Sequence, residues 1–278
     1  MPGIWRLVNT GYRSGAENMA IDEAILLSIA QGEAPPTIRF YGWSPACLSI
    51  GYSQDWVQAV NEEACAELGV DCVRRPTGGR AVLHEHEVTY AVVVPEGHRL
   101  LPKGVTESYR VLSQGILRGL QSLGVPAQMA SGHNQRKKQG TAACFDATSW
   151  YELVVDGRKL VGSAQMRRGG VILQHGSILV RFDPRKLLYV LYGKQHSGKA
   201  NLVQGLAATA VSLGEVLERQ VGFTEVANAL SAGWEETLAI SLVALELTKA
   251  ERQLAAQLVQ EKYGCEEWNV TRVKPRVV

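Results

Sequence analysis

The stretch AACFDATSW, residues 142–150, contains a single cysteine, Cys144, between a polar basic loop and a run of strand-forming residues. A cysteine thiolate is a strong nucleophile, and a neighbouring cation favours it by lowering the pKa of the thiol. In most proteins, however, a free cysteine is buried and packs as a small hydrophobic residue. Taken by itself, Cys144 fits both interpretations.

Lys159 is a second candidate, because it follows an Asp156-Gly157 pair in the run WYELVVDGRKLVGSAQ. An Asp-Gly pair between two strand-like runs is a strong signal for a β-hairpin. Counting from this turn places Lys159 opposite Val154, with Glu152 as its diagonal neighbour on the same face. Lys159 is therefore expected either to form a cross-strand ion pair or to point into a cleft as a base or anion clamp.

Two patches of small residues are expected to meet beside this hairpin. A second turn at Gly169-Gly170 predicts that His175 pairs with Ala164, which brings the runs GSAQ and LQHGS together. Small side chains on adjacent strands allow a ligand to lie close to the sheet, although close sheet packing has the same signature. The residues of the two patches are Gly162, Ser163, Ala164, His175 and Gly176.

The run RRPTGGRAVLH, residues 74–84, predicts a tight loop between two strands. Gly78 and Gly79 leave the backbone bare, so it can approach a ligand closely. The loop is not a P-loop, because the G-x-x-x-x-G-K-[ST] pattern is absent. The alternative is an ordinary hairpin in which Arg75 and its neighbouring arginines are solvated.

His84 and His86 alternate along a predicted strand and are therefore expected to share a face. Two histidines on one face can begin a metal site. No third or fourth ligand stands at a familiar spacing, so we expect no metal here and interpret the histidines as structural.

Cys144 and Lys159 meet only if the chain bends between them. Extending the hairpin register pairs Cys144 with about Gly169, ten residues beyond Lys159. At about 3.3 Å per residue, a straight strand would hold the two side chains ~30 Å apart. The segment FDATS is rich in residues that favour turns, so a fold-back is permitted.

The elements that must hold these residues follow the same patterns. Ser14 and Glu17 form a capping box for a helix that ends near Gly32. Helices are also expected over 60–69, 106–124 and 249–264, with one late strand over 241–248. Further strands are expected over the runs TIRFYGW, CLSIGY, VDCVRR, VTYAVVVP and VILQHGSILV.

Together these elements predict an α+β fold with an antiparallel-rich β-sheet flanked by helices. We expect residues 1–278 to form one globular unit, with a catalytic domain over 33–248 and a short helical extension over 249–278. The 46% of hydrophobic residues is typical of a soluble globular protein. The net charge of +2, with both signs scattered along the chain, argues against a face that binds nucleic acid.

The five cysteines are odd in number and irregularly spaced, so no zinc site or disulfide framework is expected. No signal peptide or membrane-spanning run is recognisable. These features predict a reduced, cytoplasmic protein that does not act at a membrane. We also expect a monomer that needs no cofactor.

The motifs RRPTGGRAVLH, GRKLVGSAQ and LQHGSIL together resemble those of the biotin/lipoate protein ligase superfamily. Within it, the run CFDATSWYELVVDGRKLVGSAQ is similar to that of the LipM-type octanoyltransferases, and the likeness extends over residues 37–213. The resemblance implies a mixed β-sheet flanked by helices. It also implies transfer of an octanoyl group from acyl carrier protein to a lysine of the glycine cleavage H protein or another lipoyl domain.

Carried over by position, the resemblance makes Cys144 the acyl-accepting nucleophile. It makes Lys159 the residue that lowers the pKa of the thiol and shuttles the proton. The acyl pocket and oxyanion site would be lined by Arg75, Gly78, Gly79, His84, Gly162, Ser163, Ala164, His175 and Gly176.

Three alternatives remain open at this level. An ATP-dependent lipoate–protein ligase would share most of these motifs, but adenylate chemistry needs no thiol. An octanoyl amidotransferase acting between lipoyl domains would share the chemistry and use another donor. A non-enzymatic module that binds carrier protein would form no covalent adduct.

Overall fold

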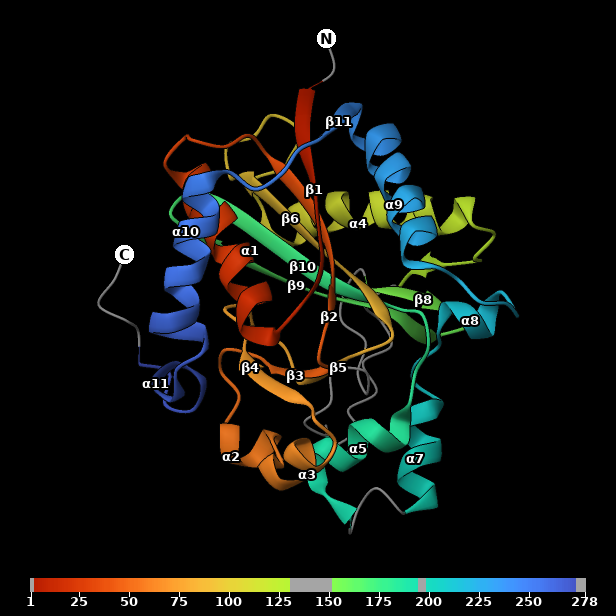
Figure 1. The fold of residues 1–278 in the computed structure, drawn as a ribbon. Helices are drawn as coiled ribbons and strands as arrows, with labels where there is room; N and C mark the ends of the chain where they lie inside the picture. The colour runs from red at the N-terminus through yellow and green to blue at the C-terminus, as the bar shows by residue number, and fades with distance from the viewer. Residues whose placement is uncertain (1–2, 131–151, 195–198, 274–278) are drawn as a thin grey trace.

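A mixed eight-stranded sheet forms the centre of the computed structural model, which describes residues 3–130, 152–194 and 199–273 (Figure 1). The strand order is β11-β1-β2-β6-β10-β9-β8-β7. Strand β1 is parallel to both of its neighbours, and the other ladders are antiparallel. The strands are β1 (Gly3–Arg13), β2 (Thr37–Trp43), β6 (Glu87–Pro95), β7 (Gln128–Met129), β8 (Leu153–Val155), β9 (Arg158–Arg168), β10 (Val171–Leu179) and β11 (Ile240–Ala244).

A second, three-stranded sheet carries the loop RRPTGG. Its central strand β3 (Cys47–Ile50) is parallel to β4 (Asp71–Arg74) and antiparallel to β5 (Val82–His84). The loop joins β4 to β5. Four helices pack around this sheet through a shared apolar cluster: α2 (Trp56–Ala59), α3 (Glu62–Glu67), α5 (Pro184–Tyr192) and α7 (Ala200–Ala207).

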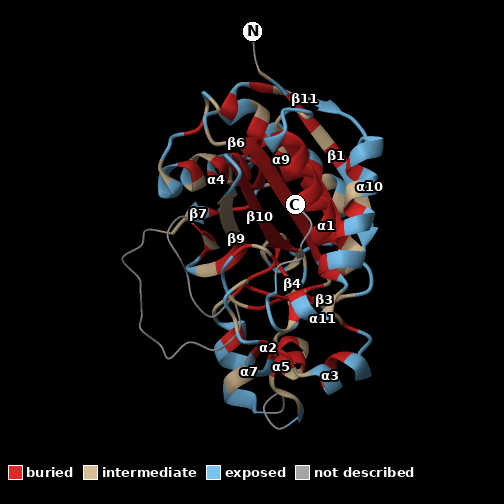
Figure 2. Cartoon of the chain, turned by 90° about the vertical axis from the view of Figure 1, so that its left-hand side faces the viewer, coloured by how far each residue is buried: buried red, intermediate tan, exposed pale blue. Residues whose placement is uncertain are grey.

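Helices cover both faces of the large sheet (Figure 1). Helices α4 (Val105–Ser122) and α9 (Phe223–Leu238) pack on one face. Helices α1 (Gly15–Ala30) and α10 (Lys249–Leu258) pack on the other, followed by a π-helical turn over Val259–Tyr263 and α11 (Glu266–Asn269). Figure 2 shows the buried strands between the two helical layers.

Helix α1 is buried on nearly all sides and carries buried polar residues toward the candidate site. The predicted capping box is confirmed, since Ser14 and Glu17 each accept a hydrogen bond from the other's backbone. The helix lies between the large sheet and α10, so even its polar residues face protein. Two of these residues, Asn18 and Asp22, are fully buried.

The predicted hairpin is confirmed in its turn and its register. Asp156 and Gly157 both adopt positive φ, at 50° and 75°, as a type I′ turn requires. Lys159 pairs with Val154 across the turn, and His175 pairs with Ala164 in the next hairpin.

A bulge in β9 decides which way Lys159 faces. Leu153 pairs with Val161 and Val154 with Lys159, so Leu160 is an extra residue on β9. Without the extra residue, Lys159 would share a face with Val161, which packs in the core under α4 and α9. The bulge moves it to the opposite face, the one that carries Gly162 and Ala164.

The first strand, β1, was not expected from the sequence. Its register shifts between Asn9 and Tyr12, and its residues alternate irregularly between buried and exposed. It is completed by parallel pairing with β11, more than 200 residues away, which no local pattern reveals. The late strand itself was expected and lies over Ile240–Ala244. Among the described residues, no helix is both long and apolar enough to cross a membrane.

Candidate functional site

A cleft lies between strands β9 and β10 of the large sheet and the three-stranded sheet. Eight of the nine residues expected to line an acyl pocket lie along it: Arg75, Gly79, His84, Gly162, Ser163, Ala164, His175 and Gly176. The ninth, Gly78, lies in the adjoining loop. Met19, Tyr41, Trp43, Ser49, Val82, Thr89 and Ser177 complete the lining.

The floor of the cleft depends on glycine. A Cβ atom added to Gly176 would lie 2.5 Å from the carbonyl oxygen of Gly162 and 2.9 Å from the Tyr90 ring. Strands β9 and β10 therefore leave no room for a side chain at this point. Beneath them, burial raises the pKa of Tyr90 to about 12, so the phenol stays neutral and donates a hydrogen bond to Ser163 Oγ at 2.7 Å.

Arg75 holds the RRPTGG loop from within. Its guanidinium donates hydrogen bonds to the carbonyl oxygens of Gly78 at 2.9 Å and Arg80 at 2.7 Å. Gly79 has a φ of 95°, and a Cβ atom there would lie 2.8 Å from Arg75 Nη2. The interpretation of Arg75 as a solvated arginine is wrong, because its side chain is buried where it satisfies these carbonyls.

The neighbouring Arg74 ties the same loop to the C-terminal segment. Its backbone N–H donates to Asn269 Oδ1 at 2.8 Å, and its Nε donates to the Asn269 carbonyl oxygen at 2.8 Å. Trp268 Nε1 in turn donates to the Arg74 carbonyl oxygen at 2.8 Å. The C-terminal helical extension thus supports the loop from outside the cleft, a role that the sequence did not indicate.

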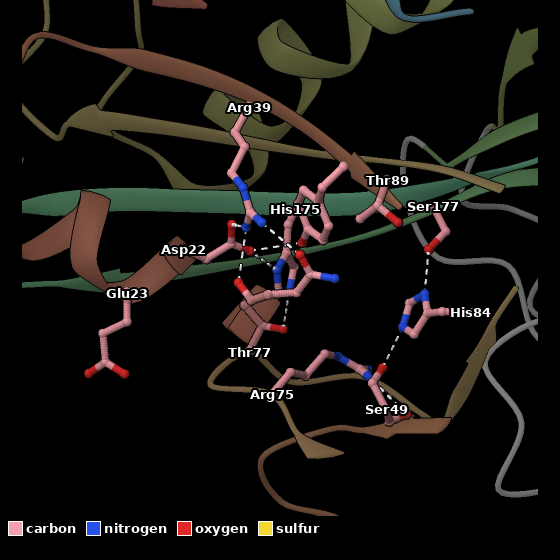
Figure 3. A network of polar contacts seen from close by, with 12 residues as sticks. Asp22, Glu23, Arg39, Ser49, Arg75, Thr77, His84, Thr89, His175 and Ser177 are labelled. Atoms are coloured by element: carbon pink, nitrogen blue, oxygen red, sulfur yellow. Dashed lines mark hydrogen bonds and ion pairs between the residues drawn. The ribbon is translucent and has the colours of Figure 1, made fainter. Parts of the chain in front are cut away.

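His175 fastens the loop to the large sheet. Its Nε2 lies 2.7 Å from Thr77 Oγ1, and its Nδ1 lies 3.1 Å from Asp22 Oδ2 (Figure 3). Asp22 also accepts hydrogen bonds from Arg39 Nη1 at 2.6 Å and Tyr41 OH at 2.9 Å. Asp22 was missed in the sequence, where its one signal is an acidic residue within the apolar run AIDEAILL.

This network contains one ion pair, Asp22–Arg39, and one neutral histidine, His175. Burial raises the pKa of the Asp22 carboxyl, but the Arg39 guanidinium and the His175 hydrogen bond more than offset it and leave that pKa below its ordinary value. Burial lowers the pKa of His175, and its hydrogen bond to Asp22 opposes this only in part. The neutral ring donates from Nδ1 to Asp22 and accepts from Thr77 at Nε2.

This assignment predicts a loss of stability in mild acid. Because the pKa of His175 in the folded chain lies below the ordinary value of 6.5, the unfolded chain binds a proton that the folded chain does not. The stabilisation is complete above pH 6.5 and is lost as the pH falls below it, by up to about 1.4 kcal/mol per pH unit. Urea unfolding at several pH values measures this slope.

A His175→Asn variant is the matched comparison. It retains an N–H donor toward Asp22, and it retains His98, whose pKa burial also lowers. The variant should lose stability less steeply than the parent between pH 6.5 and 5. Equal slopes in the two proteins would show that His175 is not held neutral.

His84 lies on the other side of the cleft. Its Nε2 is 2.7 Å from Ser49 Oγ, its Nδ1 is 2.7 Å from Glu87 Oε1, and its ring stacks on Trp43 at a centroid distance of 4.0 Å. The expectation that His84 and His86 share a strand face is wrong, because β5 ends at His84. His86 lies in the bend that follows β5, where it contacts the side chain of Arg181. In the described part of the chain, no three His, Cys, Asp or Glu side chains converge on one point.

Lys159 is buried and forms an ion pair with Glu152, with 2.5 Å between Nζ and Oε1. The diagonal contact expected from the hairpin is thus present. Ala210 forms an isolated parallel β-bridge with Lys159, in which the Lys159 N–H donates to the Thr209 carbonyl oxygen and the Val211 N–H donates to the Lys159 carbonyl oxygen. Cys144 and the basic loop 131–141 lie outside the described residues, so the contact between Cys144 and Lys159 stays a prediction.

Comparison with known families places the chain clearly. Residues 14–235 match the model of the lipoyl protein ligase A/B catalytic domain. The octanoyltransferase LipM of Kyrpidia tusciae is 49% identical over 269 residues, covering 95% of this chain and 98% of the relative. That of Bacillus subtilis is 44% identical over 273 residues, covering 96% of this chain and 98% of the relative.

Solved structures show the same architecture. A bipartite lipoate protein ligase from Thermoplasma acidophilum superposes with a TM-score of 0.82 at 26% identity, over all of both chains. A lipoate-protein ligase A bound with ATP superposes with a TM-score of 0.79 at 26% identity, over 98% of this chain and all of that one. These matches confirm the predicted α+β fold with a mixed, antiparallel-rich sheet between helices.

Proposed function

We propose that this chain moves octanoyl groups through a thioester on Cys144, since it belongs to the lipoyl protein ligase A/B catalytic domain family and within it to the LipM octanoyltransferases. The donor is octanoyl-acyl carrier protein. The acceptor is a lysine of the glycine cleavage H protein or another lipoyl domain. We propose that the enzyme acts in the cytoplasm as a monomer. Its catalytic domain would span residues 33–248, followed by a helical extension over 249–278.

The observation that supports this most strongly is the orientation of Lys159. The bulge in β9 turns it to the sheet face that carries the small-residue floor of the cleft. Its ion pair with Glu152 favours the ammonium form. An ammonium at this place is suited to stabilise a thiolate at Cys144 when FDATS folds back over the sheet.

The reaction then proceeds in two balanced halves. The Cys144 thiolate attacks the thioester carbonyl, and the tetrahedral oxyanion is stabilised by backbone N–H groups of the Gly78-Gly79 loop. The pantetheine thiolate leaves and is protonated by Lys159. In the second half, the acceptor amine attacks the acyl-cysteine, Lys159 takes back a proton from the attacking nitrogen, the thiolate of Cys144 leaves, and an amide is formed. One thioester replaces another in the first half, so no ATP is needed.

The fold by itself does not separate this reaction from that of a ligase, because the ATP-bound ligase superposes as well. The similarity to LipM relatives over nearly the whole chain favours transfer from carrier protein. The test is to mix enzyme, octanoyl-acyl carrier protein and apo-H protein with and without ATP. A separate control contains free octanoate and ATP in place of the carrier protein. We expect octanoylated H protein at equal rates in both mixtures. Product formed only from free octanoate and ATP would establish a ligase instead.

A further inference from the structure

A chain of hydrogen bonds leads from the cleft into the interior through Ser49. Arg75 Nη1 donates to Ser49 Oγ at 3.0 Å. Ser49 Oγ lies 2.7 Å from His84 Nε2, and His84 Nδ1 lies 2.7 Å from Glu87 Oε1. Figure 3 shows His84 between Ser49 and Ser177. The order serine, histidine, carboxylate is the one used to remove a proton from a hydroxyl.

The partners determine the position of each proton in this chain. Glu87 only accepts, so the ring proton of His84 lies on Nδ1 and Nε2 carries a lone pair. Arg75 only donates, so the single hydroxyl proton of Ser49 points to His84 Nε2. A hydroxyl oxygen has two acceptor positions, and Arg75 fills one of them. The second remains for a donor on a substrate in the cleft, which Ser49 lines.

Glu87 is held so that it can stabilise a cation at His84. Its Oε1 accepts from Ser177 Oγ at 2.8 Å and Thr89 Oγ1 at 2.5 Å, and Trp43 Nε1 donates to Thr89 Oγ1 at 2.7 Å. Its other oxygen, Oε2, is buried without a hydrogen-bond partner among the described residues. The negative charge is therefore only partly compensated, and an imidazolium at His84 would compensate it further.

The proposed reaction needs a proton acceptor at this place. The acceptor lysine arrives as an ammonium, and it must lose a proton before its nitrogen attacks the acyl-cysteine. Forming the amide removes two protons from the acceptor ammonium, and Lys159, which lies against Glu152, can take back only the one that it gave to pantetheine. We propose that Ser49, His84 and Glu87 form a relay that takes this proton. The proposal rests on the proposed transferase function and adds the base of its second half-reaction.

The relay step balances. The acceptor ammonium gives a proton to Ser49 Oγ as the Ser49 proton passes to His84 Nε2, which leaves a neutral amine and an imidazolium beside Glu87. After attack, the nitrogen gives its second proton to Lys159, which restores the ammonium, and Cys144 leaves as a thiolate. The imidazolium then releases its proton through Ser49 to solvent in the cleft. The charged or titratable groups facing His84 are Glu87 from β6, Arg75 from the loop and His175 from β10.

The test compares two nucleophiles acting on the same purified octanoyl-enzyme. Apo-H protein presents an ammonium and needs the relay, whereas hydroxylamine is neutral at pH 7 and does not. For Ser49→Ala and Glu87→Gln, the ratio of the apo-H protein rate to the hydroxylamine rate should fall by about 10²-fold or more. Glu236→Gln, at an exposed ion pair far from the cleft, should keep the parental ratio.

Each outcome decides the matter. A ratio that falls in both variants and partly recovers at high pH, where the acceptor amine is neutral, supports the relay. If both rates fall together, the residues are structural and the relay is wrong. An octanoyl adduct on Ser49 would make it a nucleophile and also overturn the relay. If the parental enzyme, without substitutions, forms no octanoyl adduct, the proposed function is wrong and the relay is wrong with it.

Discussion

The Cys144→Ser variant should lose octanoyl transfer by about 10³-fold or more, while binding of the carrier protein is kept. A serine hydroxyl is a far weaker acid than a thiol, so Lys159 cannot hold it as an anion at neutral pH. Losing the nucleophile of a covalent mechanism removes most of the rate enhancement. The measurement is the initial rate of octanoylation of apo-H protein, followed by mass spectrometry.

Cys265→Ser is the matched control, because Cys265 is a free cysteine of the C-terminal segment that does not line the cleft. It should retain the parental rate. If Cys144→Ser kept more than about a tenth of the rate, Cys144 would not be the nucleophile, and the enzyme would transfer the acyl group directly.

Replacing Asp22 by asparagine should lower the free energy of unfolding by about 3–5 kcal/mol. The side chains of Asp22 and Arg39 are both fully buried, so the guanidinium would be left without a counter-charge. The change keeps the size of the side chain, so the loss comes from charge and not from a cavity. Urea unfolding with linear extrapolation gives the value. The tether from Thr77 through His175 should weaken at the same time.

Glu236→Gln provides the comparison, because its ion pair with Arg118 is 60% and 47% exposed. Solvent screens such a pair, and a loss of under about 1 kcal/mol is expected. Similar losses in the two variants would show that burial does not decide the strength of the Asp22–Arg39 pair.

Local register could be predicted from the sequence, because turn residues determine it. The Asp156-Gly157 turn placed Lys159 opposite Val154, and the Gly169-Gly170 turn placed His175 opposite Ala164. Glycines marked the floor of the cleft for a similar reason, since only they allow strands to approach this closely. The bulge at Leu160 was not predicted, yet it determines the face on which Lys159 lies.

The residues that support the site could not be predicted, because their partners are distant in the sequence. His175 and Asp22 are 153 positions apart, and Asn269 and Arg74 are 195 apart. Ser49 and His84 are joined only when β3 pairs with β5. These contacts depend on packing of whole elements, which hydrophobic periodicity does not encode.

A thioester on Cys144 is tested most directly by the mass of the enzyme after mixing with octanoyl-acyl carrier protein, in the absence of ATP and acceptor. We expect one added octanoyl group, located on Cys144 by peptide mapping and removed by hydroxylamine. An unmodified enzyme, an adduct on another residue, or an adduct that appears only with ATP would contradict it.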